Sequence, residues 1–143
     1  MSRFTYIGAA YLVLIREGKV LLQRRCNTGF EDGKYGLPSG HLDGNETARE
    51  GCVREMKEEI DIRINPEDME VLHVMHRKCP SDERIDFFMS TQHYEGEGRN
   101  CEPEKCDDLD WFALDALPEN TIDYIRKAVE HIRAGVFYSE YGW

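Results

Sequence analysis

The hydrophobic positions near the start of the chain form two runs separated by a short polar segment. Residues 6–15 are almost continuously apolar, residues 16–19 read Arg-Glu-Gly-Lys, and residues 20–23 return to Val-Leu-Leu-Gln. Apolar runs of this length bounded by turn residues predict strands, and an uninterrupted run predicts burial on both faces. We therefore expect a hairpin whose first strand is buried on both sides. Residues 24–35 carry Asn, Gly and Asp, which predicts a surface loop.

The next hydrophobic pattern has a helical period. Residues 34–40 first predict a short extended piece, because Pro38 disfavours a helical conformation at Leu37. Apolar residues then recur at every fourth position: Ala48, Cys52, Met56 and Ile60. This spacing predicts a helix that begins near residues 45–47, ends near residue 60, and turns one stripe toward the core.

The second half of the chain predicts further strands and a second helix. Strand-like runs at residues 71–76 and 85–93 are joined by a polar turn, and residues 109–112 form a third, shorter run. The long polar segment 94–107 predicts a loop, and loops of this length are often functional. Residues 121–133 predict a helix capped by Asn120 or Thr121 and followed by Gly135, with this buried stripe: Ile122, Ile125, Val129 and Ile132.

Three glutamates share one face of the first predicted helix. Glu55, Glu58 and Glu59 are separated by three and four positions or adjacent, so their carboxylates point to the same side. Like charges at these spacings destabilise a helix, and hard oxygen ligands suit Mg²⁺, Mn²⁺ or Ca²⁺. The pattern therefore predicts a metal site, with a solvated acidic helix face as the alternative.

The overall charge limits the class of ligand. The chain has 143 residues, with 18 basic and 28 acidic side chains and a formal net charge of −10. This length predicts one domain spanning residues 1–143. A negative field repels the backbone of a nucleic acid, so a polymeric nucleic acid is not expected as a partner. A small phosphate ligand bridged by metal ions remains compatible with this charge.

The cysteines and the apolar run bear on location. The five cysteines include no Cys-x-x-Cys pair, so they predict reduced thiols in a cytoplasmic protein rather than a disulfide framework. Cys101 and Cys106 could form a zinc site with His73 or His76, although the spacing matches no common zinc pattern. The apolar run at residues 7–15 is too short to span a bilayer, so we expect no membrane anchor or targeting segment.

One longer motif contains the acidic helix face. It consists of Gly40, five residues, Glu46, seven residues, and then Arg54-Glu55-Met56-Lys57-Glu58-Glu59-Ile60-Asp61-Ile62. This string resembles the Nudix box: Gly, five residues, Glu, seven residues, Arg-Glu, aliphatic, any residue, Glu-Glu, any residue, Gly, aliphatic. Every defining position matches except the last glycine, which is Asp61 here. That glycine sits just past the helix in a left-handed conformation, which costs another residue about 1 kcal/mol without removing a ligand.

The resemblance covers nearly the whole chain, from the strand at residues 20–25 to the Trp111-Phe112 pair before the last helix. It implies an α/β fold, with an α/β/α sandwich around a mixed sheet. It also implies a hydrolase that cleaves the diphosphate linkage of a small nucleotide or nucleoside-diphosphate derivative by attack of water on phosphorus. The implied cofactor is Mg²⁺, for which Mn²⁺ can substitute.

Residue roles follow from the same resemblance, position by position. Glu55, Glu58 and Glu59 match the metal-binding and catalytic acids of the family, and the carbonyl of Gly40 matches a further metal ligand. Arg54 matches the arginine that positions these acids. Independently of the resemblance, the spacing of Arg54 and Glu58 predicts a helical ion pair.

Other candidate residues lie outside the three-glutamate cluster. Glu46 matches a supporting acid near the helix start, where the helix dipole favours negative charge. Glu102 or Glu104 in the long loop could supply the additional acid that some family members bring from outside the box, with a solvated acidic loop as the alternative. Arg24 and Arg25 could contact substrate phosphates or form a solvated strand end.

Two other functions are associated with this type of fold. A catalytically silent Nudix-fold domain that binds or senses a nucleotide would not need the intact Arg-Glu and Glu-Glu pairs. An isomerase of isoprenoid diphosphates needs a cysteine and glutamate pattern that is not matched here. The aromatic tail at residues 137–143 could cover the core, line a pocket or join a homodimer, and the pattern does not choose among these.

Overall fold

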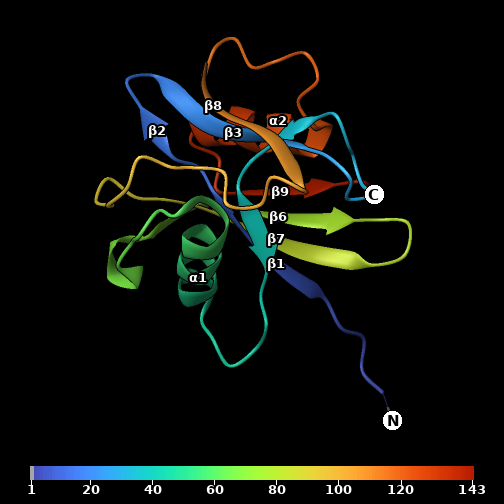
Figure 1. Cartoon of the computed structure of the whole chain (residues 1–143). Helices are drawn as coiled ribbons and strands as arrows, with labels where there is room; N and C mark the ends of the chain where they lie inside the picture. Colours follow the sequence, from blue (N-terminus) through green and yellow to red (C-terminus); the bar gives the residue numbers. More distant parts are fainter. Residues whose placement is uncertain (1) are drawn as a thin grey trace.

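The computed structural model describes residues 2–143 and contains two β-sheets and two α-helices (Figure 1). The larger sheet has the strand order β5-β1-β7-β6-β9. Its strands are β1 (Ile7–Leu12), β5 (Ser39–His41), β6 (Glu70–Lys78), β7 (Glu83–Ser90) and β9 (Tyr138–Tyr141). The β1–β7 and β6–β9 pairs are parallel and the other pairs antiparallel, so the sheet is mixed.

The smaller sheet is organised around β3 (Lys19–Arg25). This strand pairs antiparallel with each of the other three strands: β2 (Ile15–Arg16), β4 (Tyr35–Gly36) and β8 (Cys106–Ala113). The pairing of β3 with β8 brings the end of the long loop next to the N-terminal half of the chain.

The predicted N-terminal hairpin is correct only at its tip. Ile15 of β2 pairs with Val20 of β3, but β1 lies in the other sheet between β5 and β7. The apolar run therefore crosses from one sheet to the other, and Val13 and Leu14 at the crossing are fully buried. A segment that serves two sheets is covered on both sides, which accounts for its continuous hydrophobicity.

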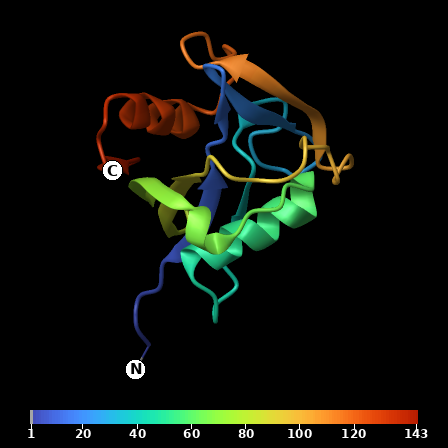
Figure 2. The ribbon, with the colours of Figure 1, turned by 90° about the vertical axis from the view of Figure 1, so that its left-hand side faces the viewer.

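The two helices lie on opposite sides of the larger sheet (Figure 2). Helix α1 (Ala48–Ile60) buries Cys52 and Met56 in one hydrophobic cluster, and α2 (Asp123–Arg133) buries Ile125 and Ala128 in another. A short 3-10 helix, η1 (Pro66–Asp68), follows α1. This arrangement confirms the predicted α/β/α sandwich around a mixed sheet. Within the described chain, neither helix is long and apolar enough to cross a membrane.

Both ends of α1 are defined by specific caps. Thr47 accepts a hydrogen bond from the Glu50 amide, and the Glu50 carboxylate accepts one from the Thr47 amide, which is a capping box. Asp61 follows the helix with φ 54° and ψ 39°, and its amide donates to the Met56 carbonyl. Asp61 therefore has the left-handed conformation expected for the glycine of the motif.

The second helix begins differently from the sequence-based expectation, and the C-terminal tail, for which no structure was predicted, forms a strand. Ile122, and neither Asn120 nor Thr121, precedes the first residue of α2, and no side chain of the described residues caps it. Asn120 instead donates to the Gly33 carbonyl, and Thr121 donates to the Pro118 carbonyl. These side chains fix the loop before the helix. The tail forms β9, which extends the larger sheet by pairing with β6.

The end of β7 and the start of β8 also differ from the strand limits predicted from the sequence. The structure ends β7 at Ser90, so His93 lies in the following loop, and it begins β8 at Cys106 within the predicted loop. His73 of β6 is fully buried, and its ring nitrogens bond the Val136 carbonyl and the Ser139 hydroxyl. The ring packs against Phe88 of β7 and His131 of α2 and bonds the segment 136–139, and nothing in the pattern of β6 alone reveals these contacts.

Candidate active site

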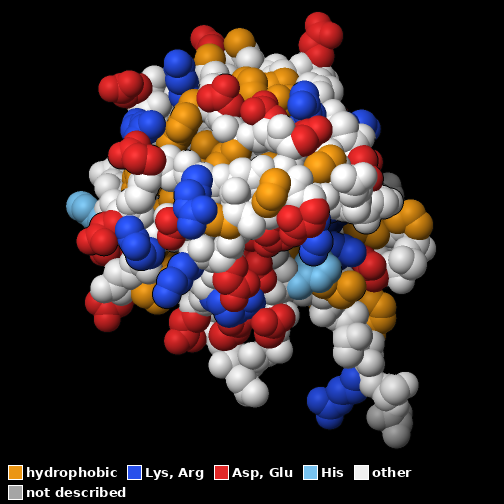
Figure 3. All heavy atoms as spheres, in the orientation of Figure 1, with side chains coloured by type: hydrophobic (Ala, Val, Ile, Leu, Met, Phe, Trp, Pro, Cys, Tyr) orange, Lys and Arg blue, Asp and Glu red, His pale blue; other side chains and the backbone are white. Residues whose placement is uncertain are grey.

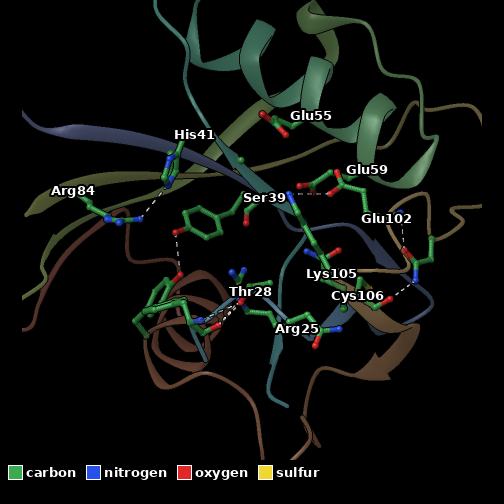
Figure 4. Close-up of a pocket in the computed structure, with 18 residues that line it drawn as sticks. Arg25, Thr28, Ser39, His41, Glu55, Glu59, Arg84, Glu102, Lys105 and Cys106 are labelled. Carbon is green, nitrogen blue, oxygen red and sulfur yellow. Dashed lines mark hydrogen bonds and ion pairs between the residues drawn. The ribbon is translucent and has the colours of Figure 1, made fainter. Parts of the chain in front are cut away.

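A cavity of about 530 Å³ opens beside the C-terminal half of α1 (Figure 4). Strands β1, β3, β5, β7 and β8, both helices and the loops around residues 28 and 102 contribute to its walls. Its carboxylates are Glu55, Glu59 and Glu102, and its basic side chains are Arg25, Arg84 and Lys105. Acidic side chains gather across the middle of the face drawn in Figure 3, with basic side chains beside them. The cavity therefore combines groups that hold cations with groups that hold anions.

Glu59 is the most perturbed acid of the cavity. Burial, together with the charges of Glu55 and Glu102, raises the pKa of the Glu59 carboxyl to about 8, against an ordinary value of 4.5. The Ser39 amide donates a hydrogen bond to this carboxylate, which acts in the opposite direction (Figure 4). The buried Oε2 atom of Glu59 has no hydrogen-bond partner within residues 2–143. A buried acceptor without a partner is costly, so this site calls for a further cation or proton.

Glu55 is held at the cavity wall by Arg54. The Nη1 atom of Arg54 lies 2.8 Å from Glu55 Oε1, and its other nitrogens bond Glu46 at 3.0 and 3.1 Å. The hydrogen bond from Arg54 lowers the pKa of Glu46, whereas burial raises the pKa of Glu55 in spite of Arg54. The predicted positioning role of Arg54 thus has a geometric basis in Glu46 and Glu55.

Gly40 and Glu58 differ in how closely they approach the cavity. A Cβ atom on Gly40 would lie 2.1 Å from the carboxyl carbon of Glu55, so only glycine permits this approach of backbone to carboxylate. Glu58 is 60% exposed and lies outside the lining of the cavity, with Arg54 Nη1 at 3.8 Å. The predicted Arg54–Glu58 ion pair is present but is looser than the contacts of Arg54 with Glu46 and Glu55.

Glu102 reaches the cavity from the predicted loop. It lines the wall with Glu55 and Glu59, whereas its neighbour Glu104 lies outside the lining and is exposed. Lys105 Nζ lies 3.9 Å from Glu102 Oε2. Of the two loop acids considered from the sequence, the structure thus brings Glu102 to the helix carboxylates.

The basic side chains include two that the sequence did not single out, Arg84 and Lys105. Arg84 donates to both carboxylate oxygens of Asp82, at 2.9 and 3.3 Å, and its Nη1 lies 3.2 Å from His41 Nε2. Arg25 also lines the cavity, but Arg24 is bound to Asp107 at 2.7 Å outside it. No periodic or motif signal distinguishes Arg84, because its position depends on how β7 pairs with β1.

The donors fit a hard divalent cation, although they are not arranged as a finished metal site. Within residues 2–143, no group of three or more His, Cys, Asp or Glu side chains is already placed to hold a metal ion. The same finding leaves the zinc alternative without a site in the described chain. However, the unpartnered Oε2 of Glu59 and the close approach of Gly40 to Glu55 are what oxygen ligation of Mg²⁺ or Mn²⁺ would use.

Comparison with known proteins assigns the family. The family model of the NUDIX domain matches residues 5–132 of this chain. The chain belongs to the NUDIX family. Its fold is similar to a MutT NUDIX hydrolase from Burkholderia pseudomallei, with a TM-score of 0.80 and 28% identity over 88% of this chain and 97% of that one.

Curated relatives of this NUDIX chain show a similar level of sequence identity. A NAD-capped RNA hydrolase NudC from Chromobacterium violaceum is 29% identical over 78% of this chain and 40% of its own length. An ADP-ribose pyrophosphatase from Methanocaldococcus jannaschii is 25% identical over 85% of this chain and 70% of its own length. The chain thus spans about two fifths of the length of the NudC protein it matches.

Proposed function

We propose that this NUDIX protein is a metal-dependent pyrophosphohydrolase that cleaves the diphosphate linkage of a small nucleotide or nucleoside-diphosphate derivative. The observation that carries the proposal is the buried Oε2 atom of Glu59, which has no hydrogen-bond partner among residues 2–143 and belongs to an acid beside Glu55 and Glu102. Three acids that face basic side chains in one cavity suit a reaction in which a cation and phosphate oxygens meet. The family of the chain supports the same reaction class.

In this proposal the residues of the motif hold the metal ion. Glu55, Glu58 and Glu59, with the carbonyl of Gly40, would be the ligands, and Glu58 is exposed enough to turn toward them. Bound Mg²⁺ or Mn²⁺ would neutralise phosphate oxygens and lower the pKa of the attacking water. Arg54 keeps Glu55 in place through its bonds to both Glu55 and Glu46.

Other side chains act on the substrate and on the proton. A carboxylate not fully used by metal, Glu59 or Glu102, accepts the proton of the attacking water. Arg25, Arg84 and Lys105 bind phosphate oxygens of the substrate, and Asp82 orients the Arg84 guanidinium for this contact. The chain thereby supplies the ligands, the proton acceptor and the positive charge for an in-line attack of water on phosphorus.

The substrate class is narrowed by charge and by the relatives. The ADP-ribose pyrophosphatase relative matches this chain over most of its length, which favours a small nucleotide derivative. The net charge of −10 disfavours a polymer, so we do not propose capped RNA from the NudC relatives, of which this chain covers the smaller part. We further propose that residues 1–143 act as one NUDIX domain and that the protein works in the cytoplasm. A homodimer formed through the C-terminal tail is a further prediction.

The proposed function is tested by a substrate panel. Wild-type protein is incubated with Mg²⁺ and with nucleoside triphosphates, ADP-ribose, dinucleoside polyphosphates and sugar nucleotides, and phosphate and pyrophosphate release are measured. We expect turnover of at least one member and a loss of about a hundredfold or more in kcat for Glu59→Gln. Glu130→Gln, which changes an exposed glutamate on α2, is the matched control and should retain wild-type turnover.

The same panel separates the enzyme from the binding alternative. Equal turnover by Glu59→Gln, or no product from any member, would contradict the proposed reaction. Tight nucleotide binding without product would instead favour the catalytically silent binding or sensor domain.

A further inference from the structure

We propose that Asn100 is a positioning residue that fixes Glu102 beside Glu59 and so completes the acidic wall of the cavity. This inference rests on the proposed function. It concerns the loop between β7 and β8, which lies outside the motif and differs in kind from the helix that carries the other acids. Two sets of hydrogen bonds fix this loop. The first, called the internal bracket below, is made by the Asn100 side chain within the loop, and the second, called the attachment, joins the loop backbone to the end of α1.

The internal bracket is formed by both polar atoms of the Asn100 side chain. Its Oδ1 accepts a hydrogen bond from the Glu102 amide at 3.0 Å, and its Nδ2 donates to the Cys106 carbonyl at 2.6 Å. The Glu102 carbonyl in turn accepts hydrogen bonds from the amides of Lys105 and Cys106, at 2.9 and 3.0 Å. The Glu102 backbone is therefore held on both sides, and Asn100 closes the turn against the start of β8.

The attachment joins this loop to the end of α1. The Cys101 amide donates to the Glu59 carbonyl at 3.0 Å, and the Arg99 amide donates to the Ile60 carbonyl at 2.9 Å. The last carbonyls of a helix lack partners within the helix, so the loop satisfies groups that would otherwise need water. As a result, the backbone of Glu59 is bonded directly to the residue that precedes Glu102.

The two sets of hydrogen bonds link the position of Glu102 to the position of Glu59. Asn100 links Glu102 to Cys106 of β8, and Cys101 links the same loop to Glu59 of α1. Asn100 is half-buried at the cavity and carries no charge, so it can hold the turn without adding a negative group to the acidic wall. A carboxylate displaced by about 1 Å loses much of its catalytic value, which is why the bracket matters for turnover.

The proposal is tested with a double-mutant cycle on the whole protein, using the substrate identified by the panel. We expect Asn100→Ala to lower kcat about tenfold with KM within about twofold, because Glu102 loses its position rather than the substrate its contacts. Glu102→Gln should lower kcat at least as much. The double variant should match Glu102→Gln within about twofold, since Asn100 acts only through Glu102.

Two further variants distinguish a loss of the position of Glu102 from a general loss of structure. Asn100→Ser keeps an acceptor for the Glu102 amide but loses the bond to Cys106, so its kcat should lie between wild type and Asn100→Ala. Asn65→Ala removes the equivalent side-chain acceptor for the Glu67 amide at η1, away from the cavity, and should leave kcat unchanged. Melting temperatures of all variants are measured alongside kcat.

Three results from the Asn100 variants would overturn the inference. These are wild-type kcat in Asn100→Ala, multiplicative losses in the double variant, and Asn100→Ser no better than Asn100→Ala when both are folded. Failure of the inference is distinguishable from failure of the proposed function. If Glu59→Gln is inactive while Glu102→Gln is fully active, only the role of the loop is wrong, whereas an active Glu59→Gln removes the metal-dependent reaction itself.

Discussion

Two groups of charged side chains in the described chain, one buried and one half-buried, differ in whether their charges are matched. The first joins β6 and β7 on the side of α2. Arg77 and Asp86 are 4% and 0% exposed, and Arg77 Nε lies 2.7 Å from Asp86 Oδ2. Tyr11 donates to Asp86 and accepts from Arg77, and the Arg77 guanidinium stacks 3.7 Å from the centre of the Tyr124 ring. Every charge in this group faces an opposite charge or a polarisable ring.

The second group is the acidic wall of the cavity. Glu59 stands beside Glu55 and Glu102, and its raised pKa reflects burial together with the two neighbouring negative charges. Arg54 is directed to Glu55 and Glu46 and does not reach Glu59. This difference in charge matching indicates a different role for each group. Matched buried charge holds the sheet together, whereas the half-buried Glu59, whose Oε2 has no partner among the described residues, suits a cation supplied from outside.

Breaking the matched group should give the largest loss of stability. Asp86→Ala leaves the buried Arg77 guanidinium without its carboxylate, so we expect the free energy of unfolding to fall by about 3–5 kcal/mol. Chemical denaturation followed by circular dichroism measures this change.

A second variant shows whether the charge or the packing is responsible. In the double variant Arg77→Met with Asp86→Ala, no buried charge is left unpaired, so most of the lost stability should return. A single variant that loses less than about 1 kcal/mol would contradict the description of this pair as matched and buried.

The unmatched group should make stability depend on pH in the absence of metal. Glu59 has an ordinary pKa of 4.5 in the unfolded chain and a pKa of about 8 in the folded protein. The folded state therefore holds a proton that the unfolded state releases, and stability should fall as the pH rises from about 4.5 through about 8. Millimolar Mg²⁺ should oppose this fall, because the ion stabilises the ionised carboxylates.

Glu59→Gln is the control for this pH dependence. Burial lowers the pKa of His73, which favours the folded state as the pH rises and so acts against Glu59 in part of the same range. Subtracting the melting curves of the variant from those of wild type removes this contribution. The difference should decline between pH 5 and 8, and a flat difference would argue against an unmatched Glu59.

The smallest expected effect concerns the cap of the helix that carries the acids. Asp61→Gly should raise stability by about 1 kcal/mol, because glycine adopts the left-handed conformation without strain. Asp61 Oδ2 also lies 3.3 Å from Arg99 Nε, but this ion pair is exposed and offsets little of the gain. An unchanged or lower melting temperature would contradict the capping explanation, and Arg99→Ala reports the contribution of the ion pair alone.

Local signals in the sequence predicted the part of the site that lies on one element. The spacing of Glu55 and Glu59 fixes them on one side of α1, and the Asp61 position follows from where the helix ends. The motif named Gly40 as a metal ligand with Glu55, and the structure brings the two residues into close approach.

Features that depend on contacts between distant segments could not be predicted in the same way. Arg84 enters the cavity because β7 pairs with β1, and the apolar N-terminal run divides between two sheets. The bracket formed by Asn100 requires Cys106 to begin β8, inside a segment whose composition predicts a loop. These outcomes are set by tertiary pairing, which no short pattern in the sequence encodes.

The most direct test of the account is a calorimetric titration of the metal-free protein with Mn²⁺ at neutral pH. Wild type and the Glu130→Gln control should bind with the same affinity, and Glu59→Gln should bind at least about tenfold more weakly. That result would tie the unmatched charge at Glu59 to a bound cation. Equal binding by Glu59→Gln, or no binding by wild type at millimolar Mn²⁺, would contradict the claim that the acidic wall is a metal site.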